Sequence, residues 1–544
     1  MGAMISTLCS DKSQSVLHND QVARKEDKYQ KMDGKLTEEK PPSIVFEKLE
    51  STEAKPHHST LIPKLRKTDS LILPSEKACI SEEAVKKRYS FVQDIDNSHF
   101  GKVYKATMNG RQGEDGLQKM FAIKLLNKRI NSSQVSHFLY EIEFMKALDH
   151  PNIVKFFECY ESQSNMYIVE EYLEGGTLDQ RFAENMAPFS ESSLKSYLFQ
   201  ILLAVNFLHL RGILHRDIRP ENFILVDSST EELKLIDFGN AVIVDDFEKF
   251  NQPSGCLKFS APEVLKKSYG KKADVWSVGV IMYYFMTAAY PFEDDDSHVL
   301  EAKIEAVDYD RSAITKSEFS DNAKELVFKL LEPDSTRRLT ALQALRHPFF
   351  ADRRKEIMDL GEKCLNAQMF ENLRVFHYNT TMQREMRALI VQSLPTAAPE
   401  VQKIVNVFNY MDQDFSGSIS AREIEAIYEK FNIKLRDGEI EEIIDSLYFK
   451  EKALVTYLEF IAATLDKEFY RNKQRIRELF NYMDVDLSGE IDYKDIQECF
   501  KRFGRLLDDS KIKRMISECD NNRDGKISFE EFYDIIVAER IRQA

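Results

Sequence analysis

The chain has 544 residues, of which 43% are hydrophobic and 11% aromatic. At about 100–200 residues per domain, it is long enough for several domains. These fractions exclude a wholly disordered chain, and its 19 glycines, 15 prolines and 7 cysteines exclude collagen-like and disulfide-rich proteins. The formal net charge of −15 disfavours nucleic-acid binding, because neutralising phosphates requires clustered Lys and Arg.

No apolar run reaches the roughly 18–20 residues that span a bilayer. The nearest candidate, residues 275–290, fits a buried core helix better. The N-terminus lacks the charged and apolar regions of a secretory signal, and the cysteines form no CxxC pair. These features predict an intracellular protein of the cytoplasm.

The composition and the hydrophobic pattern of the sequence change several times along the chain. Residues 10–85 are rich in charged residues and Ser and show no sustained period, which predicts mostly disorder. Short β-like runs begin at Tyr89 and give way to helical patterns that continue to Phe350. We therefore predict a multidomain protein with a variable region 1–88, a mixed α+β domain 89–350, a helical connector 351–397 and an all-α domain 398–544.

The last domain contains an internal repeat. Acidic loops open with Asp412, Asp484 and Asp520, so the last two lie 36 residues apart and the first two twice as far apart. A degenerate copy of the same unit, SLYFKEKALVTYLEF, lies between them near position 448. This period predicts an array of four helix–loop–helix units.

Six motifs follow one another in the middle of the chain. They are FAIK ending at Lys124, EIEFMKALDHP with Glu141, HRDIRPEN at 215–222, IDFG with Asp237, APE at 261–263 and DVWSVG at 274–279. In this order they resemble the motifs of eukaryotic protein kinases over about residues 89–350. The resemblance implies a bilobal α+β kinase fold that binds ATP and Mg²⁺.

The resemblance also implies a role for individual residues of these motifs. Phosphoryl transfer depends on positioned metal ions and neutralised charge. Lys124 would hold the α- and β-phosphates and be held by Glu141. Asp237 and Asn222 would bind Mg²⁺, and Asp217 would orient the substrate hydroxyl and accept its proton.

Two further features of these motifs bear on the substrate and the fold. Arg219 stands where the family usually has a Lys beside the γ-phosphate, in the form HRDIRPEN that is typical of Ser/Thr kinases rather than tyrosine kinases. Glu263 is expected to form a structural ion pair with Arg338.

The nucleotide-binding loop departs from the family pattern G-x-G-x-x-G-x-V. Asp96 and Ser98 replace two glycines, and Gly101 keeps the third. Glycine normally lets the backbone approach the phosphates closely, so we expect weakened ATP binding. The predicted loop consists of Ile95, Asp96, Asn97, Ser98, His99, Phe100, Gly101, Lys102 and Val103.

Three other positions depart as well: Glu170, Cys256 and Thr177. YIVEEYLEGG aligns with the family hinge, which places Glu170 at the gatekeeper position and Glu171 at the hinge, where it is predicted to contact ATP. Cys256 replaces a Thr that supports Asp217, and Thr177 replaces a Glu that binds substrate and ribose. Two readings follow: an active kinase, or a largely inactive pseudokinase.

The activation segment has few phosphorylation sites. Ser254 and Ser260 are the only hydroxyl side chains between Asp237 and Glu263, and neither is well placed. Three acidic residues could instead supply the anion that Arg216 would seek: Asp245, Asp246 and Glu248. The sequence therefore predicts that activity does not require phosphorylation of this segment.

The acidic loops have the ligand spacing of EF-hands, with oxygen donors at alternate positions, Gly at position 6 and a carboxylate at position 12. Loop 1 (412–423) offers Asp412, Asp414, Ser416, Ser418 and Glu423. Loop 3 (484–495) offers Asp484, Asp486, Ser488, Glu490 and Asp495. Loop 4 (520–531) offers Asp520, Asn522, Asp524, Lys526 and Glu531.

Two of the four loops are expected to differ in affinity. Asp495 in loop 3 is shorter than the usual Glu, which predicts weaker Ca²⁺ binding or more competition from Mg²⁺. Loop 2 (448–459) keeps Glu459 but has Tyr448, Lys450 and Lys452 at ligand positions. We expect loop 2 to be empty and to serve as the packing partner of loop 1.

A kinase domain, a connector and four EF-hands in one chain resemble the calcium-dependent protein kinases of plants and protists, over about residues 89–544. The family implies a Ca²⁺-activated Ser/Thr kinase that acts on protein substrates. It also implies that the connector is an autoinhibitory junction, which occupies the substrate cleft at low calcium and is withdrawn by the EF-hands. An apolar stripe of the junction fits an EF-hand groove: Phe370, Leu373, Phe376, Met386, Leu389 and Ile390. For the junction, the alternative is an ordinary linker helix. For the whole chain, the alternative function is that of a calcium-sensing scaffold.

The first residues match the N-myristoylation pattern M-G-x-x-x-[ST]. Gly2 would carry the myristoyl group, and Cys9 could take a second acyl chain that stabilises membrane attachment. The alternative is that the natural chain starts at Met4. We expect a monomer, reversibly attached to a membrane surface if Gly2 is acylated.

Overall fold

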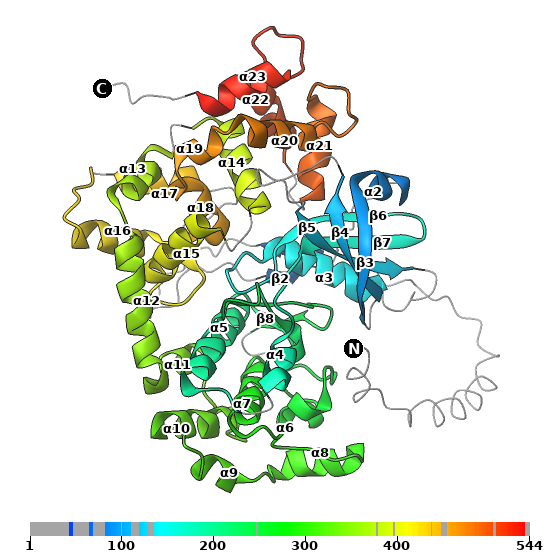
Figure 1. The fold of residues 1–544 in the computed structure, drawn as a ribbon, viewed down its shortest axis with the longest axis vertical. Coiled ribbons are helices and arrows are strands. Elements are labelled where there is room, and N and C mark those ends of the chain that lie inside the picture. Colours follow the sequence, from blue (N-terminus) through cyan, green and yellow to red (C-terminus); the bar gives the residue numbers. More distant parts are fainter. Residues whose placement is uncertain are drawn as a thin grey trace, which may run out of the picture.

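The computed structural model (Figure 1) describes residues 43–46, 65–68, 82–98, 101–109, 119–128, 135–185, 188–245, 249–376, 379–394, 398–436, 438–447, 454–503 and 507–538. A smaller lobe built on a β-sheet lies above a larger helical lobe (Figure 1). A C-terminal helical module lies beside the smaller lobe, and helix α12 (Ala351–Cys364) leads up to it from the larger lobe (Figure 1). The chain is therefore multidomain, as the sequence predicts.

The smaller lobe is an antiparallel five-stranded sheet in the order β3-β4-β5-β7-β6, with helix α3 (Val135–Ala147) against it. The register places Lys124 of β5 between Val103 of β4 and Ile168 of β7. The strands are β3 (Tyr89–Ser98), β4 (Gly101–Met108), β5 (Met120–Asn127), β6 (Phe156–Glu161) and β7 (Asn165–Glu171).

The larger lobe forms around two buried helices, α5 (Glu191–Leu210) and α7 (Lys272–Thr287). The other helices are α4 (Leu178–Asn185), α6 (Pro262–Leu265), α8 (Ser297–Ala306), α9 (Arg311–Thr315), α10 (Asp321–Leu330) and α11 (Ala341–Leu345). The larger lobe also contains short strands, β8 (Ile213–Leu214), β9 (Phe223–Leu225), β10 (Leu233–Leu235) and β11 (Val242–Ile243). Its 3-10 turns are η3 (Pro220–Asn222), η4 (Leu257–Phe259) and η5 (Pro348–Phe350).

One described helix, α5, is long and apolar enough to cross a membrane by length and composition, although the sequence pointed to residues 275–290 as the nearest candidate. Most of α5 is buried in the core of the larger lobe. Its N-terminus is exposed, and there the Ser190 side chain accepts a hydrogen bond from the Ser193 amide. Residues 275–290 begin within α7 and are also largely buried, as expected for a core helix.

The N-terminal region, predicted to be mostly disordered, contains three described elements. Strand β1 (Ser43–Phe46) pairs antiparallel with β2 (Leu65–Thr68). Helix α2 (Glu82–Arg88) leads directly into β3 and buries Val85.

The connector is helical, as predicted, but it is divided into α12 (Ala351–Cys364), α13 (Ala367–Val375) and α14 (Thr381–Ser393). Asn366 caps α13, and Thr380 and Gln383 form a capping box at the start of α14. These caps explain where α13 and α14 begin.

The C-terminal module consists of paired helix–loop–helix units. Strand β12 of the first unit pairs with β13 of the second, and Ile491 and Ile527 exchange hydrogen bonds between the third and fourth. The elements are α15 (Pro399–Met411), β12 (Ser418–Ser420), α16 (Ala421–Lys430), α17 (Glu439–Leu447), β13 (Leu454–Thr456), α18 (Tyr457–Thr464), α19 (Lys467–Tyr470), α20 (Lys473–Met483), α21 (Tyr493–Arg502), α22 (Asp509–Cys519) and α23 (Phe529–Val537).

Candidate active site and calcium module

A buried ion pair lies between the sheet and α3. The Nζ atom of Lys124 is 2.6 Å from a carboxylate oxygen of Glu141 and 3.4 Å from one of Asp237. Burial opposes the charge on Lys124, but the carboxylates of Asp237 and Glu141 outweigh it and hold its pKa above the ordinary value. The predicted phosphate-binding Lys is therefore charged and directed toward the predicted metal ligand.

The loop from His215 to Asn222 brings the predicted base together with its neighbours. The Nδ2 atom of Asn222 donates to the carbonyl of Asp217 at 2.7 Å and to its carboxylate at 3.1 Å. The Cys256 amide donates to the other carboxylate oxygen at 3.4 Å, and the Nε atom of Arg219 lies 3.7 Å from that oxygen. Cys256 thus supports Asp217 through its backbone, although its side chain replaces the usual Thr.

Asp274, on α7, holds this loop in place. Its carboxylate, which is buried, accepts hydrogen bonds from the amides of His215 and Arg216, each at 2.9 Å, and lies 2.9 Å from the Nε2 atom of His209. Arg216 has a φ of 68°, a conformation that costs energy for a side-chain-bearing residue. The sequence showed the motif DVWSVG, but only the structure reveals that its Asp fixes the strained turn.

The expected ion pair between Glu263 and Arg338 is confirmed. It is bidentate, with N–O distances of 2.5 and 3.0 Å, and Arg338 is fully buried. It joins α6 to the segment before α11.

The predicted nucleotide loop lies at the end of the β3–β4 pair. Strands β3 and β4 remain paired out to Ser98 and Gly101, and Lys102 lies 3.7 Å from Asp94 on the exposed surface. A Cβ atom at Gly101 would lie 1.9 Å from the carbonyl oxygen of Leu125, so glycine is required there by the neighbouring strand. His99 and Phe100 lie outside the described residues.

The structure separates the two hinge carboxylates. The side chain of Glu171 accepts a hydrogen bond from the Lys155 amide at 2.9 Å and forms an ion pair with Lys234, so contact with a nucleotide would use the main chain. Glu170, opposite Ala122 in the sheet, faces the cluster around Lys124. Burial and the nearby carboxylate of Glu141 raise the pKa of Glu170 to about 8.

Glu170 is expected to make ATP binding sensitive to pH. At a pH below its pKa of about 8, the Glu170 carboxyl is neutral. At a higher pH it adds a negative charge to those of Glu141 and Asp237 beside the predicted phosphate site. The KM for ATP should therefore rise between about pH 7 and 9 in the parent chain. In Glu170→Gln it should stay flatter over that range, and parallel pH profiles for the two proteins would contradict this role.

Main-chain carbonyls and an aromatic ring hold Arg216. Its guanidinium donates to the carbonyls of Asn240, at 2.6 Å, and Gln252, at 3.4 Å, and lies over the ring of Phe250. Asp245 is exposed, and Asp246 and Glu248 lie outside the described residues.

Activity is still predicted not to require phosphorylation of this segment, because main-chain carbonyls hold Arg216 without a phosphate. Treatment with a phosphatase should leave calcium-stimulated transfer unchanged within about twofold. Loss of transfer after treatment, and its recovery on rephosphorylation, would show instead that a phosphate is needed.

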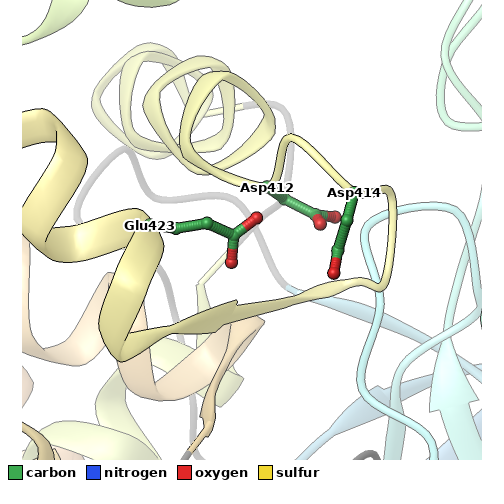
Figure 2. A group of neighbouring side chains, drawn as sticks. All are labelled: Asp412, Asp414 and Glu423. Carbon is green, nitrogen blue, oxygen red and sulfur yellow. The ribbon is translucent and has the colours of Figure 1, made fainter. Parts of the chain in front are cut away.

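Loop 1 gathers the carboxylates of Asp412, Asp414 and Glu423, which face a common space between the loop and α16 (Figure 2). One oxygen from each lies within 4.8 Å of the others. Burial, together with Glu423 and Asp414, raises the pKa of Asp412 well above its ordinary value. A hard cation would relieve this repulsion, so the residues present fit Ca²⁺.

Loop 3 makes a similar cluster from Asp484, Asp486 and Asp495, also within 4.8 Å. Asp495 accepts hydrogen bonds from the amides of Val485 and Asp492, at 2.9 and 3.0 Å.

In loop 4 the Asp520 carboxylate accepts a hydrogen bond from the Gly525 amide at 2.9 Å, and Lys526 forms an ion pair with Glu490 of loop 3 at 2.7 Å. The other predicted ligands lie within the same two turns: Ser488, Asn522, Asp524 and Glu531.

The second unit is the packing partner of the first, as predicted. Ser418 pairs with Thr456 across β12 and β13, and Glu459 is buried at the start of α18, where it accepts a hydrogen bond from the Thr456 amide. Residues 448–453 lie outside the described residues, so the expected absence of calcium from loop 2 stays a prediction.

The connector packs into the C-terminal module. Its six stripe residues are all buried in one core with the EF-hand helices: Phe370, Leu373, Phe376, Met386, Leu389 and Ile390. Gln383 donates to the carbonyls of Ile535 and Ala538, and Lys511 forms a 2.7 Å ion pair with the buried Glu385.

The module also contacts the smaller lobe. Glu158 of β6 is fully buried and accepts hydrogen bonds from the hydroxyls of Tyr89 and of Tyr482 on α20, the latter at 2.9 Å. Arg88 lies 3.3 Å from Glu158 and 4.0 Å from the centre of the Tyr482 ring. A buried charge at this interface is therefore balanced by residues from both sides.

These features define a protein kinase followed by EF-hands. Residues 89–350 match the family model of the protein kinase domain, residues 404–428 that of an EF hand, and residues 473–537 that of an EF-hand domain pair. A kinase domain takes ATP and Mg²⁺, and EF-hands bind Ca²⁺.

Similar proteins match most of the chain. Calcium-dependent protein kinase 3 of Plasmodium berghei is 31% identical over 452 residues, 82% of this chain and 79% of that protein. Calcium-dependent protein kinase 2 of Zea mays is 30% identical over 83% of this chain and 86% of its own length, and calcium-dependent protein kinase 33 of Arabidopsis thaliana is 29% identical over 83% and 84%. The chain belongs to the calcium-dependent protein kinase family.

Proposed function

We propose that the chain is a catalytically active Ser/Thr kinase that transfers the γ-phosphate of ATP to protein hydroxyls when calcium is bound. The contact of Lys124 with Glu141, at 2.6 Å, carries this proposal. A charge network of this kind positions the phosphates, and the chain assembles it with Asp237 and the loop of Asp217.

Asp237 and Asn222 supply the oxygen donors that suit Mg²⁺. The metal, when bound, neutralises the charge of the transferring phosphoryl group. Asp217 accepts the proton of the substrate hydroxyl, and Arg219 places a positive charge next to it. Glu141 keeps Lys124 in the position where it meets the phosphates.

We further propose that the junction, residues 351–397, inhibits the kinase at low calcium. In support, the stripe of α13 and α14 is apolar and fills the EF-hand module, so the same face would be available to the kinase when the module releases it. Moving such a switch from 1:99 to 99:1 requires about 5.5 kcal/mol of differential binding. Loops 1, 3 and 4 together could supply it.

We also propose acylation of Gly2 and Cys9, which would attach a cytoplasmic kinase to membrane surfaces. Support comes from the N-terminal motif alone, because both residues lie outside the described part of the chain.

A calcium-sensing scaffold is the second candidate. It is favoured by the altered nucleotide loop and by Glu170, whose carboxyl faces the phosphate-binding Lys124. The two functions differ in one assay: transfer of labelled γ-phosphate to a basic protein, in calcium and in chelator. Transfer that rises with calcium supports the kinase, whereas no transfer in either condition leaves the scaffold.

A further inference from the structure

Loop 1 of the calcium module is inserted into the larger lobe of the kinase. Phe415, at position 4 of the loop, is only 8% exposed and belongs to the core of that lobe. Its ring packs edge-on against Phe199 of α5, with centroids 5.7 Å apart. At the same position, Leu487 of loop 3 is 79% exposed and Arg523 of loop 4 is also exposed, so the burial of Phe415 is not a property of the loop fold.

Polar side chains of the kinase hold the backbone of the same loop. The Nδ2 atom of Asn206 donates to the Phe415 carbonyl at 2.7 Å. The guanidinium of Arg211 donates to the Ser416 carbonyl at 3.2 Å and to the Ser418 hydroxyl at 2.9 Å. Asn206 and Arg211 are both buried, so each of these contacts is made away from water.

Loop 1 lies so close to the kinase that its sixth position, Gly417, has no room for a side chain. A Cβ atom at Gly417 would lie 2.4 Å from the ring of Phe207 and 2.8 Å from the ring of His150. The glycine that gives an EF-hand its turn, here with a φ of 70°, therefore also permits contact with the kinase.

We propose that the kinase has a socket for loop 1, formed by Phe199, Phe207, Asn206, Arg211 and His150, and that seating Phe415 in it raises the calcium affinity of the loop. This proposal rests on the calcium regulation proposed above. It adds a specific route by which the kinase body and one calcium site act on each other.

The contacts of the socket are compatible with a bound cation. An EF-hand binds Ca²⁺ through the side chains at positions 1, 3, 5 and 12 and the main-chain carbonyl at position 7. Asn206 and Arg211 hold other atoms, namely the carbonyls of Phe415 and Ser416 and the hydroxyl of Ser418. The kinase therefore fixes the loop and leaves the ligand oxygens for the ion.

Preorganisation gives the direction of the coupling. A loop already fixed in its binding conformation loses less entropy when it takes up the ion, so its affinity rises. By linkage, calcium in loop 1 must favour the seated arrangement by the same factor. The positive charge of Arg211 opposes a second cation, whereas the nearby carboxylates of Asp149 and Asp412 attract it.

The test compares Phe415→Asn with Leu487→Asn in the full chain. Both residues have a positive φ, 60° and 61°, which Asn tolerates, but only Phe415 is in the socket. Loops 3 and 4 are silenced in every protein by Asp495→Asn and Glu531→Gln, so that calorimetry with Ca²⁺ reports loop 1. We expect Phe415→Asn to weaken Ca²⁺ binding by about fivefold or more and Leu487→Asn to leave it unchanged.

A kinase-side variant separates coupling from damage to the loop. Asn206→Ala removes the donor to the Phe415 carbonyl without changing loop 1, and it should also weaken Ca²⁺ binding, by a smaller factor. In both variants amide hydrogen exchange should increase at residues 206–211. Unchanged or tighter Ca²⁺ binding in both, in chains whose thermal unfolding shows that they are folded, would overturn the proposal.

Neither measurement depends on phosphate transfer. A chain that shows the coupling but transfers no phosphate would reject the kinase activity and keep the socket. If the chain transfers phosphate in response to calcium but these variants bind Ca²⁺ as the parent chain does, the kinase activity is kept and the socket is rejected.

Discussion

Asp217→Asn is expected to lower kcat for phosphate transfer by about 10²–10⁴-fold, the usual contribution of a general base. The substitution keeps the size of the side chain and an oxygen that can accept from the Cys256 amide, but removes the group that takes the proton. The loss should appear mainly in kcat, because Asp217 acts on the substrate hydroxyl rather than on ATP.

Two measurements make this result specific. Asp308→Asn, which changes an exposed Asp on the same lobe, should leave kcat unchanged. Calorimetry should show that Asp217→Asn binds calcium as the parent chain does, because loops 1, 3 and 4 are untouched. If Asp217→Asn transfers phosphate as fast as the parent chain, the measured transfer does not arise at this site.

The sequence alone was sufficient for contacts that a chemical motif specifies. Lys124 and Glu141 lie on neighbouring elements, and each belongs to a motif whose role requires the other. Glu263 and Arg338 are 75 residues apart, and their pairing was predicted from the resemblance to protein kinases. In the EF-hands, the ligands lie within one loop, so local spacing is enough to identify them.

Contacts between domains could not be predicted in this way. The burial of Phe415 against Phe199, and the bond from Tyr482 to Glu158 across 324 residues, depend on how two separately folded parts meet. No periodicity or spacing records that geometry. For Arg216, the contacts with the main-chain carbonyls of Asn240 and Gln252 were also not predicted, because every residue has a carbonyl and no sequence pattern singles one out.

The division of the junction is an intermediate case. Its helical character and apolar stripe were predicted, whereas its breaks were not. Yet Thr380 followed by Gln383 has the spacing of a capping box, and that pattern marks the start of α14. Local capping chemistry therefore contained the information on where the last helix begins.

Deleting residues 351–544 is expected to give transfer that no longer depends on calcium. If the junction acts only as an inhibitor, the kinase domain in chelator should be about 100-fold more active than the full chain in chelator, the factor between 1% and fully released molecules. In the full chain, Glu423→Gln and Glu531→Gln should each raise the calcium concentration that gives half-maximal activity, because each removes a carboxylate oxygen from a calcium site.

The structure gives the opposite outcome a physical basis. The module supplies Tyr482 to the buried Glu158 and Phe415 to the core of the larger lobe, and deletion would remove both. Glu158 lies in β6, the edge strand next to β7, which carries Glu170 and Glu171. A truncated kinase that stays inactive, while the full chain responds to calcium, would therefore mean that the docked module activates the kinase directly by bracing both lobes, rather than by relieving inhibition.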